Sequence, residues 1–314
     1  MLILKKYRET RLHASLSQKK TSSVYFCLFQ VLGEVDESSP RYIMNGVAVY
    51  FDVLCAAVRR KLIFTLEPSL VSYFAAAIGG LRYLCWSVPQ SRMRYLLWLI
   101  FANLCRTIIV NDSITQKEVR RALIFGKGRV HNICYGVDAD FFGLREKSDG
   151  YVLVPGDAFR DDEYLEDLIE RTNYKFCRLT RREDVCARWE CLKRKYPDRI
   201  RLEYRIPHSR LPDVYKGASV TLLPISKKNE PAGLTCLLQS LASGVPVVTD
   251  SEKTGCDYIS EFSLGQITES RVEMESAINA YYQSAALNVG AFERARARYS
   301  WATLKNDWIR CIRA

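Results

Sequence analysis

The sequence is poor in histidine and has no closely paired cysteines. None of its three histidines, His13, His131 and His208, lies at metal-ligand spacing from another candidate ligand, so a structural zinc site is not expected. The 11 cysteines include no C-x-x-C pair, and several lie in apolar periodic runs, among them Cys105 and Cys236. This distribution favours free thiols in a reducing compartment over a disulfide framework.

The sequence also has no leader segment, membrane-spanning run, internal repeat or low-complexity tract. The N-terminal stretch MLILKKYRET has four apolar residues before its charges. Such a stretch is too short for a signal peptide or a membrane anchor. The most apolar segment, residues 91–106, is shorter than the roughly 20 residues that span a bilayer. We therefore expect a cytosolic protein.

Composition and charge describe a basic globular chain. Of its 314 residues, 48% are hydrophobic and 26% are charged, and this length suggests two domains. The 46 Lys and Arg against 35 Asp and Glu give a net charge of +11. The partner surface is therefore expected to be anionic: nucleotide phosphates, acidic lipid headgroups or nucleic acid. Nucleic acid is the least expected, because no recognised motif or basic strip interleaved with aromatics is present.

Strand and helix patterns alternate along the chain, which predicts parallel sheets covered by helices on both faces. Strands are predicted at residues 24–31, 62–66, 82–88, 107–111, 151–155, 175–179, 201–206 and 245–248. Helices are predicted at residues 42–58, 70–78, 91–106, 115–123 (with Thr115 as its cap), 162–171, 183–196 and 256–259, and an amphipathic run extends from 271 to the end. The polar segment 143–150, with glycine at both ends, predicts a domain boundary.

The segment SRMRYLLWLIFANLCR, residues 91–106, has two interpretations. It is either a buried helix covering a sheet or an interfacial helix on a membrane surface. In the second interpretation Tyr95, Trp98 and Phe101 embed in the membrane while nearby arginines bind anionic headgroups. Those arginines are Arg82, Arg92, Arg94 and Arg106.

The stretch NEPAGLTCLLQSLASGVPVVTD, residues 229–250, joins a polar loop, a short helix and a buried strand. An apolar helical stripe is formed by Leu234, Leu237, Leu238 and Leu241. Thr235 and Gln239 share the opposite face, and Gly233 lets another group approach the first N–H donors of the helix. The positive end of this helix suits a phosphate, and Gln239 lies one turn deeper, where it can bond a hydroxyl of the same ligand.

This stretch resembles the signature of retaining, nucleotide-sugar-dependent glycosyltransferases of the GT-B fold, the glycogen-synthase-like family (glycosyl transferases group 1). In that family a glutamate that binds the donor ribose stands where this sequence has Gln239. The resemblance assigns the glutamate near the transferred sugar to Glu230, with a shift of one residue. It also covers GVDADFF at 136–142 and ARARYSW at 295–301.

The same resemblance implies further donor-binding residues. Arg160, in GDAFRDD after Gly156, matches the family's diphosphate-binding basic residue, and an arginine can grip two phosphate oxygens at once. The turn at Ile206 matches the seat of the base, and Lys227 lies near the expected diphosphate. Alternatively, Arg160 is a solvated side chain paired with a neighbouring aspartate, and Lys227 belongs to a solvated loop. The whole implied donor-binding set is Gly156, Arg160, Ile206, Lys227, Gly233, Leu234, Thr235 and Gln239, with Glu230 and Arg160 as catalytic residues.

The implied fold has two Rossmann-like doubly wound domains facing across a cleft. They are a shortened acceptor-side domain at 1–143 and a nucleotide-sugar domain at 150–290. A C-terminal helix at 291–314 is expected to pack back on the first domain. The implied reaction is transfer of a sugar, of the hexosyltransferase type, from a nucleotide-diphosphate sugar to a lipid-linked or polysaccharide acceptor. It would proceed with retention, at the inner face of a membrane and without a metal, since Asp138 and Asp140 belong to the GVDADFF turn.

A second function stays open: a non-catalytic GT-B protein that binds a nucleotide-sugar or supports a partner enzyme. It is suggested by the uncharged Gln239, by the short first domain, and by the absence of a glycine-rich loop after its first strand. Family members often carry a histidine near the sugar, where this sequence has Cys85-Trp86-Ser87.

Overall fold

The computed structural model describes residues 2–4, 41–43, 63–65, 76–77, 81–85, 87–124, 129–227, 232–284 and 288–313. They form two compact units, here called unit 1 (residues 1–135 with 302–314) and unit 2 (residues 136–301). The predicted strand at 24–31 and most of the predicted helices at 42–58 and 70–78 lie outside the described residues.

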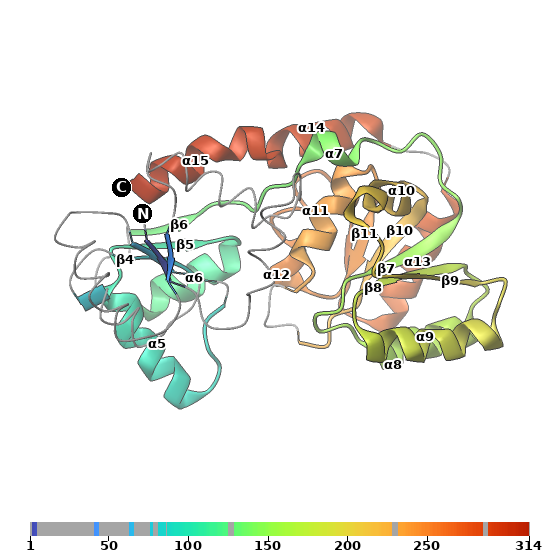
Figure 1. Cartoon of the computed structure of the whole chain (residues 1–314), viewed down its shortest axis with the longest axis horizontal. Helices are drawn as coiled ribbons and strands as arrows, with labels where there is room; N and C mark the ends of the chain where they lie inside the picture. The colour runs from blue at the N-terminus through green and yellow to red at the C-terminus, as the bar shows by residue number, and fades with distance from the viewer. Residues whose placement is uncertain are drawn as a thin grey trace. The chain divides into compact units, whose positions relative to one another are not determined.

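Unit 1 is built on a parallel sheet with the strand order β2-β1-β3-β4-β5-β6 (Figure 1). Its strands are β1 (Leu2–Leu4), β2 (Arg41–Ile43), β3 (Ile63–Thr65), β4 (Leu81–Leu84), β5 (Thr107–Val110) and β6 (Val130–Asn132). Every residue of β4 and β5 is buried, as expected for parallel strands covered on both faces. The prediction of a helix starting at residue 42 was wrong there, because Arg41–Ile43 pairs with β1 instead.

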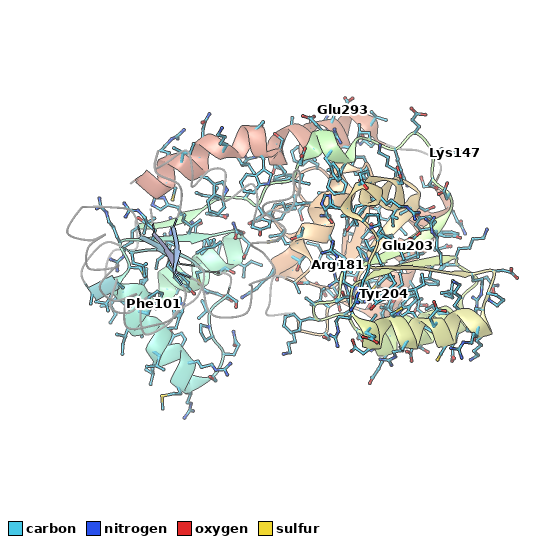
Figure 2. All side chains as sticks on the ribbon, in the orientation of Figure 1. Phe101, Lys147, Arg181, Glu203, Tyr204 and Glu293 are labelled. Carbon is cyan, nitrogen blue, oxygen red and sulfur yellow. The ribbon has the colours of Figure 1, made fainter. Side chains whose placement is uncertain are left out.

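The helix α5 (Arg92–Leu104) of unit 1 buries its aromatic residues. Trp98 and Phe101 are 2% and 0% exposed, and the ring of Phe101, labelled in Figure 2, meets that of Tyr83 edge to face at 5.0 Å between centroids. This corrects the interfacial interpretation in which these aromatics embed in a membrane. Arg82 is also buried, so it is not available to a headgroup.

The N-cap of the helix α6 (Ser113–Ala122) lies three residues before the predicted one. Asp112, not Thr115, is the N-cap: the backbone N–H of Thr115 donates to the Asp112 carboxylate at 2.6 Å. Thr115 is fully buried inside the helix. A carboxylate at this position accepts from an otherwise unpaired N–H and complements the helix dipole.

The last helix, α15 (Trp301–Arg313), belongs to unit 1 from residue 302 onward. The fully buried Trp308 donates through Nε1 to the carbonyl of Cys134 at 3.3 Å. Indole rings are usually buried with this donor paired, so Trp308 attaches the helix to the segment after β6.

Unit 2 contains a second parallel sheet, of order β12-β11-β10-β7-β8-β9. Its strands are β7 (Tyr151–Pro155), β8 (Phe176–Thr180), β9 (Ile200–Tyr204), β10 (Ala218–Leu223), β11 (Val247–Thr249) and β12 (Gly265–Ile267). Counted from β7, the order reads 6-5-4-1-2-3, that of the doubly wound Rossmann sheet. The order reverses between β7 and β10, so the loops that follow these two strands diverge and leave a crevice at their carboxyl ends.

Helices cover both faces of this sheet (Figure 1). The helices of unit 2 are α7 (Ala139–Phe142), α8 (Asp162–Arg171), α9 (Glu183–Lys195), α10 (Leu211–Lys216), α11 (Leu234–Ala242), α12 (Glu252–Gly255), α13 (Arg271–Gln283) and α14 (Val289–Tyr299), with a 3-10 turn at His208–Arg210. Helices α8, α9 and α13 share one core with the sheet. Helices α10 and α11 lie on the other face (Figure 1), and α11 packs against α14.

Two predicted segments differ in the structure. The short helix expected at residues 256–259 is instead α12, four residues earlier, because Ser251 caps it by accepting from the N–H of Thr254. The segment predicted as a domain boundary, residues 143–150, lies within unit 2, which begins at Gly136, and backbone bonds connect it to the rest of that unit. Arg145 donates to the carbonyl of Ser243 at 2.9 Å, and Asp149 donates to that of Gly217 at 2.7 Å.

Candidate functional site

The loops that follow β7 and β10 meet at the carboxyl edge of the unit 2 sheet. Arg160 and Ile225 form an antiparallel bridge, and the N–H of Ser226 donates to the carbonyl of Phe159 at 2.8 Å. In open α/β sheets a ligand binds at the point where the strand order reverses. The structure therefore places these two loops beside the expected ligand position.

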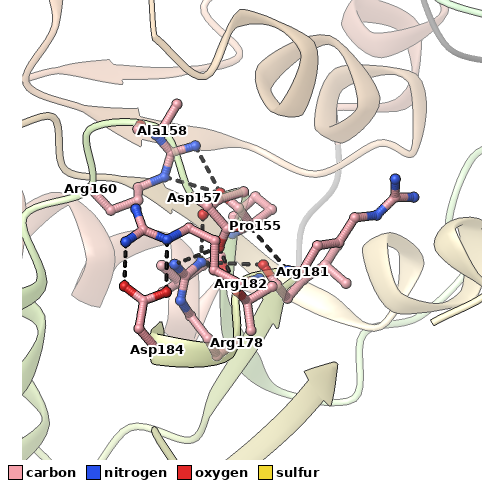
Figure 3. Close-up of polar contacts among 12 residues, drawn as sticks. Pro155, Asp157, Ala158, Arg160, Arg178, Arg181, Arg182 and Asp184 are labelled. Carbon is pink, nitrogen blue, oxygen red and sulfur yellow. Dashed lines mark hydrogen bonds and ion pairs between the residues drawn. The ribbon is translucent and has the colours of Figure 1, made fainter. Parts of the chain in front are cut away.

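Arg160 lies between these loops and the start of α11. Its side chain is 7% exposed, and three of its five N–H donors bond backbone carbonyls: Nε and Nη2 donate to Pro155 at 3.0 and 2.8 Å, and Nη1 donates to Ala158 at 2.9 Å (Figure 3). One further N–H on each terminal nitrogen has no partner among the described residues. The alternative in which Arg160 is a solvated residue paired with an aspartate is therefore wrong.

Two glycines make room for this guanidinium. A Cβ on Gly233 would lie 3.1 Å from Nη2 and 3.3 Å from Nη1 of Arg160, and a Cβ on Gly156 would lie 3.2 Å from Nη2. Both glycines have a positive φ, 76° for Gly156 and 88° for Gly233, which L-residues rarely adopt. The glycines thus bring the positive charge of Arg160 next to the first turn of α11.

The N-terminus of α11 has no side-chain cap among the described residues. Its N-cap, Gly233, has no side chain to satisfy the first N–H groups, and the first turn holds no acidic residue. The predicted apolar stripe is confirmed, since Leu234, Leu237, Leu238 and Leu241 are all buried. Leu234 therefore offers a ligand only its backbone N–H. Free N–H groups, the positive helix end and Arg160 together make an anion-binding position.

Gln239 is partly exposed on the predicted polar face of α11, and its amide has a specific partner. Tyr215 donates its hydroxyl to Oε1 of Gln239 at 2.8 Å. Burial, together with the nearby Cys236 thiol, raises the pKa of Tyr215, so this hydroxyl stays a neutral donor. The bond orients the Gln239 amide and leaves its NH₂ group for a ligand.

A second arginine, Arg178 on β8, supports the turn after β7. It is fully buried, donates through Nη1 to the carbonyls of Val154 at 2.9 Å and Gly156 at 2.6 Å, and pairs with Asp157 at 3.3 Å. Burial lowers its pKa to about 10, with Asp157 opposing the shift and Arg160 adding to it. At neutral pH Arg178 is therefore charged.

Asp157 connects the ends of β7 and β8. It accepts from the Thr180 hydroxyl at 2.5 Å and from the Arg181 N–H at 3.0 Å. Sequence reasoning missed both Arg178 and Asp157. The available signal was a charged residue inside an apolar strand, FCRLT, and an aspartate directly after the turn glycine.

More arginines follow β8 and β9 at the same edge. Arg182 pairs with Asp184, whereas the exposed guanidinium of Arg181 points away from this cluster in Figure 3. Figure 2 labels Arg181 and Tyr204 near the ends of these strands, and Arg205 follows Tyr204 in a left-handed conformation with a φ of 49°. This edge of the sheet is therefore basic beyond Arg160.

The remaining predicted donor residues are placed differently. Lys227 is exposed, and its Nζ lies 4.6 Å from the centroid of the Phe159 ring, so Lys227 contacts the loop that carries Arg160. Thr235 is partly exposed in the first turn of α11. Ile206 follows β9, two strands from β7 and thus about 10 Å along the edge. Glu230 lies outside the described residues.

The described residues contain no group of three or more His, Cys, Asp or Glu side chains able to hold a metal ion. Asp138 serves as a helix cap, accepting from the N–H of Phe141 at 3.1 Å. The nine described cysteines are free thiols. Among the described helices none is long and apolar enough to cross a membrane.

No protein-family model matches the chain, and no relative is found among curated proteins. Solved structures do match along its whole length. Sucrose-phosphate synthase from Thermosynechococcus elongatus gives a TM-score of 0.72 at 14% identity, over 99% of this chain and 98% of that one. Alr3699/HepE from Anabaena, in complex with UDP-glucose, gives 0.70 at 13% identity, over 98% and 97%.

The chain has the GT-B fold. TarM superposes with a TM-score of 0.58 at 12% identity over 93% of this chain and 58% of its own length. The two parallel sheets of units 1 and 2 are the two Rossmann-like sheets of the GT-B fold. The basic edge of the unit 2 sheet carries Gly156, Arg160 and Gly233, three of the residues that the sequence resemblance predicts to bind a donor.

Proposed function

We propose that the protein is a glycosyltransferase that takes a sugar from a nucleotide-diphosphate donor. The observation that carries the proposal is the position of Arg160, between Gly156 and Gly233 and against the N-terminus of α11. The guanidinium of Arg160 and the positive end of α11 meet there, at the position where a sheet of Rossmann order binds a ligand. Alr3699/HepE, which shares the fold, was solved with UDP-glucose, and this supports a nucleotide-sugar donor.

In this proposal the diphosphate lies against the first turn of α11. The backbone N–H groups of Leu234 and Thr235 and the two remaining N–H groups of Arg160 bond its oxygens, and Lys227 adds charge. The NH₂ group of Gln239 bonds the ribose one turn deeper, and the base lies toward Ile206. These donors neutralise the charge on the leaving diphosphate, so we propose that the reaction needs no metal.

The proposed transfer breaks the bond between the anomeric carbon and the diphosphate oxygen, which keeps the electron pair. An acceptor hydroxyl bonds the same carbon and loses its proton, so the products are a nucleoside diphosphate and a glycosylated acceptor. We propose a hexosyl donor, Glu230 beside the transferred sugar, retention of configuration, and a lipid-linked or polysaccharide acceptor at the inner face of a membrane. Contacts to the diphosphate raise the rate most, because negative charge develops there in the transition state.

A thermal-shift screen against UDP, GDP, ADP and their common sugar conjugates tests the donor site. Because a ligand that binds only the folded state stabilises it by mass action, a concentration of 100 times Kd raises the free energy of unfolding by about 2.7 kcal/mol. We expect a selective rise in Tm with one nucleotide, followed by release of that nucleoside diphosphate from its sugar conjugate. If none of the nucleotides raises Tm, the proposal is wrong.

The second candidate is a GT-B protein that binds a nucleotide-sugar without transferring it. It is favoured by one observation: the amide of Gln239 is already bonded to Tyr215 and carries no charge. Binding of a nucleotide in the screen, with no turnover of any sugar conjugate, would select this candidate.

The substitution Gln239→Glu tests whether this side chain faces the ribose. A carboxylate still accepts from Tyr215 and also accepts from both hydroxyls of a diol, and charge-assisted bonds are about twice as strong as neutral ones. We expect donor binding to be kept or tightened by about 0.5 to 1.5 kcal/mol, measured by calorimetry. The control is Gln283→Glu on α13, which adds the same charge elsewhere in unit 2. Weaker binding by Gln239→Glu than by this control contradicts the assignment.

A further inference from the structure

Helix α5 in unit 1 exposes a row of large aliphatic side chains. Five of its thirteen residues form the row, at helical spacings of 3, 4, 7 and 11 from the first: Met93 (70% exposed), Leu96 (56%), Leu97 (50%), Ile100 (57%) and Leu104 (41%). A helix of this length spans about 18 Å. Scattered exposed apolar residues are ordinary, but a continuous row marks a surface that meets another apolar phase.

The opposite side of α5 already supplies the core. Trp98, Phe101 and Ala102 are buried there, and Tyr95 and Leu99 pack against the same cluster. The helix is therefore apolar on two sides with different chemistry, aromatic toward the sheet and aliphatic toward solvent. Packing in the core accounts for the first side only.

The charged residues of α5 are both arginines, and both lie at its N-terminal end, where the helix dipole is positive. The helix has no acidic residue, Ser91 makes no side-chain cap bond, and Arg92 and Arg94 occupy its first turn. Cations beside the positive end of a helix dipole destabilise the helix. Neither arginine has an acidic partner among the described residues. An external anion would compensate both the arginines and the helix end.

A cavity of about 460 Å³ opens beside this end of the helix. Arg92 and Arg121 line it together with Tyr95 and Glu118. Arginine side chains bind phosphate groups through parallel N–H bonds. The cavity is thus a place for a phosphate next to the aliphatic row.

We propose that the exposed row of α5 lies on an anionic phospholipid surface, with Arg92, Arg94 and Arg121 binding lipid phosphates. The row inserts among acyl chains, and the arginines sit at headgroup level. A lipid surface fits the row because its apolar side chains adjoin arginines, which suit the phosphates of anionic headgroups. This surface is separate from the nucleotide position proposed for unit 2.

Sedimentation of the full-length protein with vesicles tests the proposal. We expect it to bind vesicles of phosphatidylcholine containing phosphatidylglycerol, and to bind pure phosphatidylcholine vesicles much less. Leu96→Gln with Ile100→Gln should lower the partition coefficient at least about tenfold, since two buried aliphatic side chains are lost. Arg92→Gln with Arg94→Gln should lower it about 30-fold at low salt, because each basic residue near an anionic surface contributes about fivefold, and the loss should shrink at high salt.

Control variants make the same kinds of substitution elsewhere, so they show whether the position on α5 or only the change in side-chain type affects vesicle binding. Val272→Gln with Val289→Gln removes two exposed apolar side chains from unit 2, and Lys193→Gln with Arg194→Gln removes two exposed charges from α9. Both control variants should bind vesicles like the unchanged protein. The Tm of every variant is measured alongside.

Three outcomes overturn the proposal. One is equal vesicle binding by the unchanged protein and Leu96→Gln with Ile100→Gln. In the second, the unchanged protein does not bind vesicles but self-associates in ultracentrifugation, and this variant does not. The row would then be an interface between copies of the chain. The third is no vesicle binding together with a lowered Tm of this variant, which means that the chain itself covers the row.

Discussion

The substitution Arg160→Ala is expected to weaken nucleoside diphosphate binding by about 1.5 to 3 kcal/mol, the range for hydrogen bonds to charged groups. The reason is the location of the guanidinium, which presents one N–H from each terminal nitrogen toward Gly233 at the start of α11. Calorimetric titration with the nucleotide identified in the screen measures the change. Arg160→Lys keeps the charge without the planar fork, so an intermediate loss is expected.

The control for Arg160 is Arg182→Ala, which removes a positive charge from the same edge of the sheet. Arg182 is exposed and paired with Asp184, and exposed ion pairs contribute little to stability. Its loss should leave both stability and nucleotide binding nearly unchanged. An unchanged dissociation constant for a folded Arg160→Ala variant would return Arg160 to a purely structural role, bonding Pro155 and Ala158.

The substitution Arg178→Met should destabilise unit 2 by about 3 to 5 kcal/mol, the usual result of removing one partner of a buried ion pair. Methionine fills similar space but leaves the Gly156 carbonyl and the Asp157 carboxylate without their shared donor. The corresponding fall in Tm is about 10 °C. Thermal unfolding followed by circular dichroism measures it.

The matched control is Arg171→Met on α8. Arg171 also bonds two carboxylates, those of Asp167 and Glu275, but its side chain is 46% exposed. Its removal should change the free energy of unfolding little, because exposed ion pairs are screened by solvent. If both variants lose the same stability, burial of Arg178 is not what makes its contacts strong, and its role in supporting the turn after β7 is contradicted.

Much of unit 2 was predictable because its signals are local. Residues 151–155 and 162–171 were predicted with the bounds that β7 and α8 have. The stripe of four leucines in α11 was predicted from its spacing alone. These patterns depend on the period of a helix or strand and on nearby turn residues, which the chain displays directly.

Predictions were less successful where two residues could cap the same helix, or where two sides of a helix could face the sheet. For α6, Asp112 and Thr115 were both able to cap, and the backbone path selected Asp112. For α5, the periodicity is apolar on nearly all sides, so it did not tell which side faces the sheet. Packing placed the aromatic side inward because Phe101 fits against Tyr83, and this left the aliphatic row exposed.

The sequence by itself determined the α/β class, the alternation of strands and helices in unit 2, and the helix that starts after Gly233; a role for Arg160 beside it was implied by the resemblance. Only the tertiary structure decided how those residues meet. The approach of Arg160 to Gly233, the support of the turn after β7 by Arg178, and the bond from Tyr215 to Gln239 each join residues that are far apart in the sequence. The physical reason is that side-chain bonds depend on burial and strand order, which place distant residues side by side, whereas sequence patterns report only the local period.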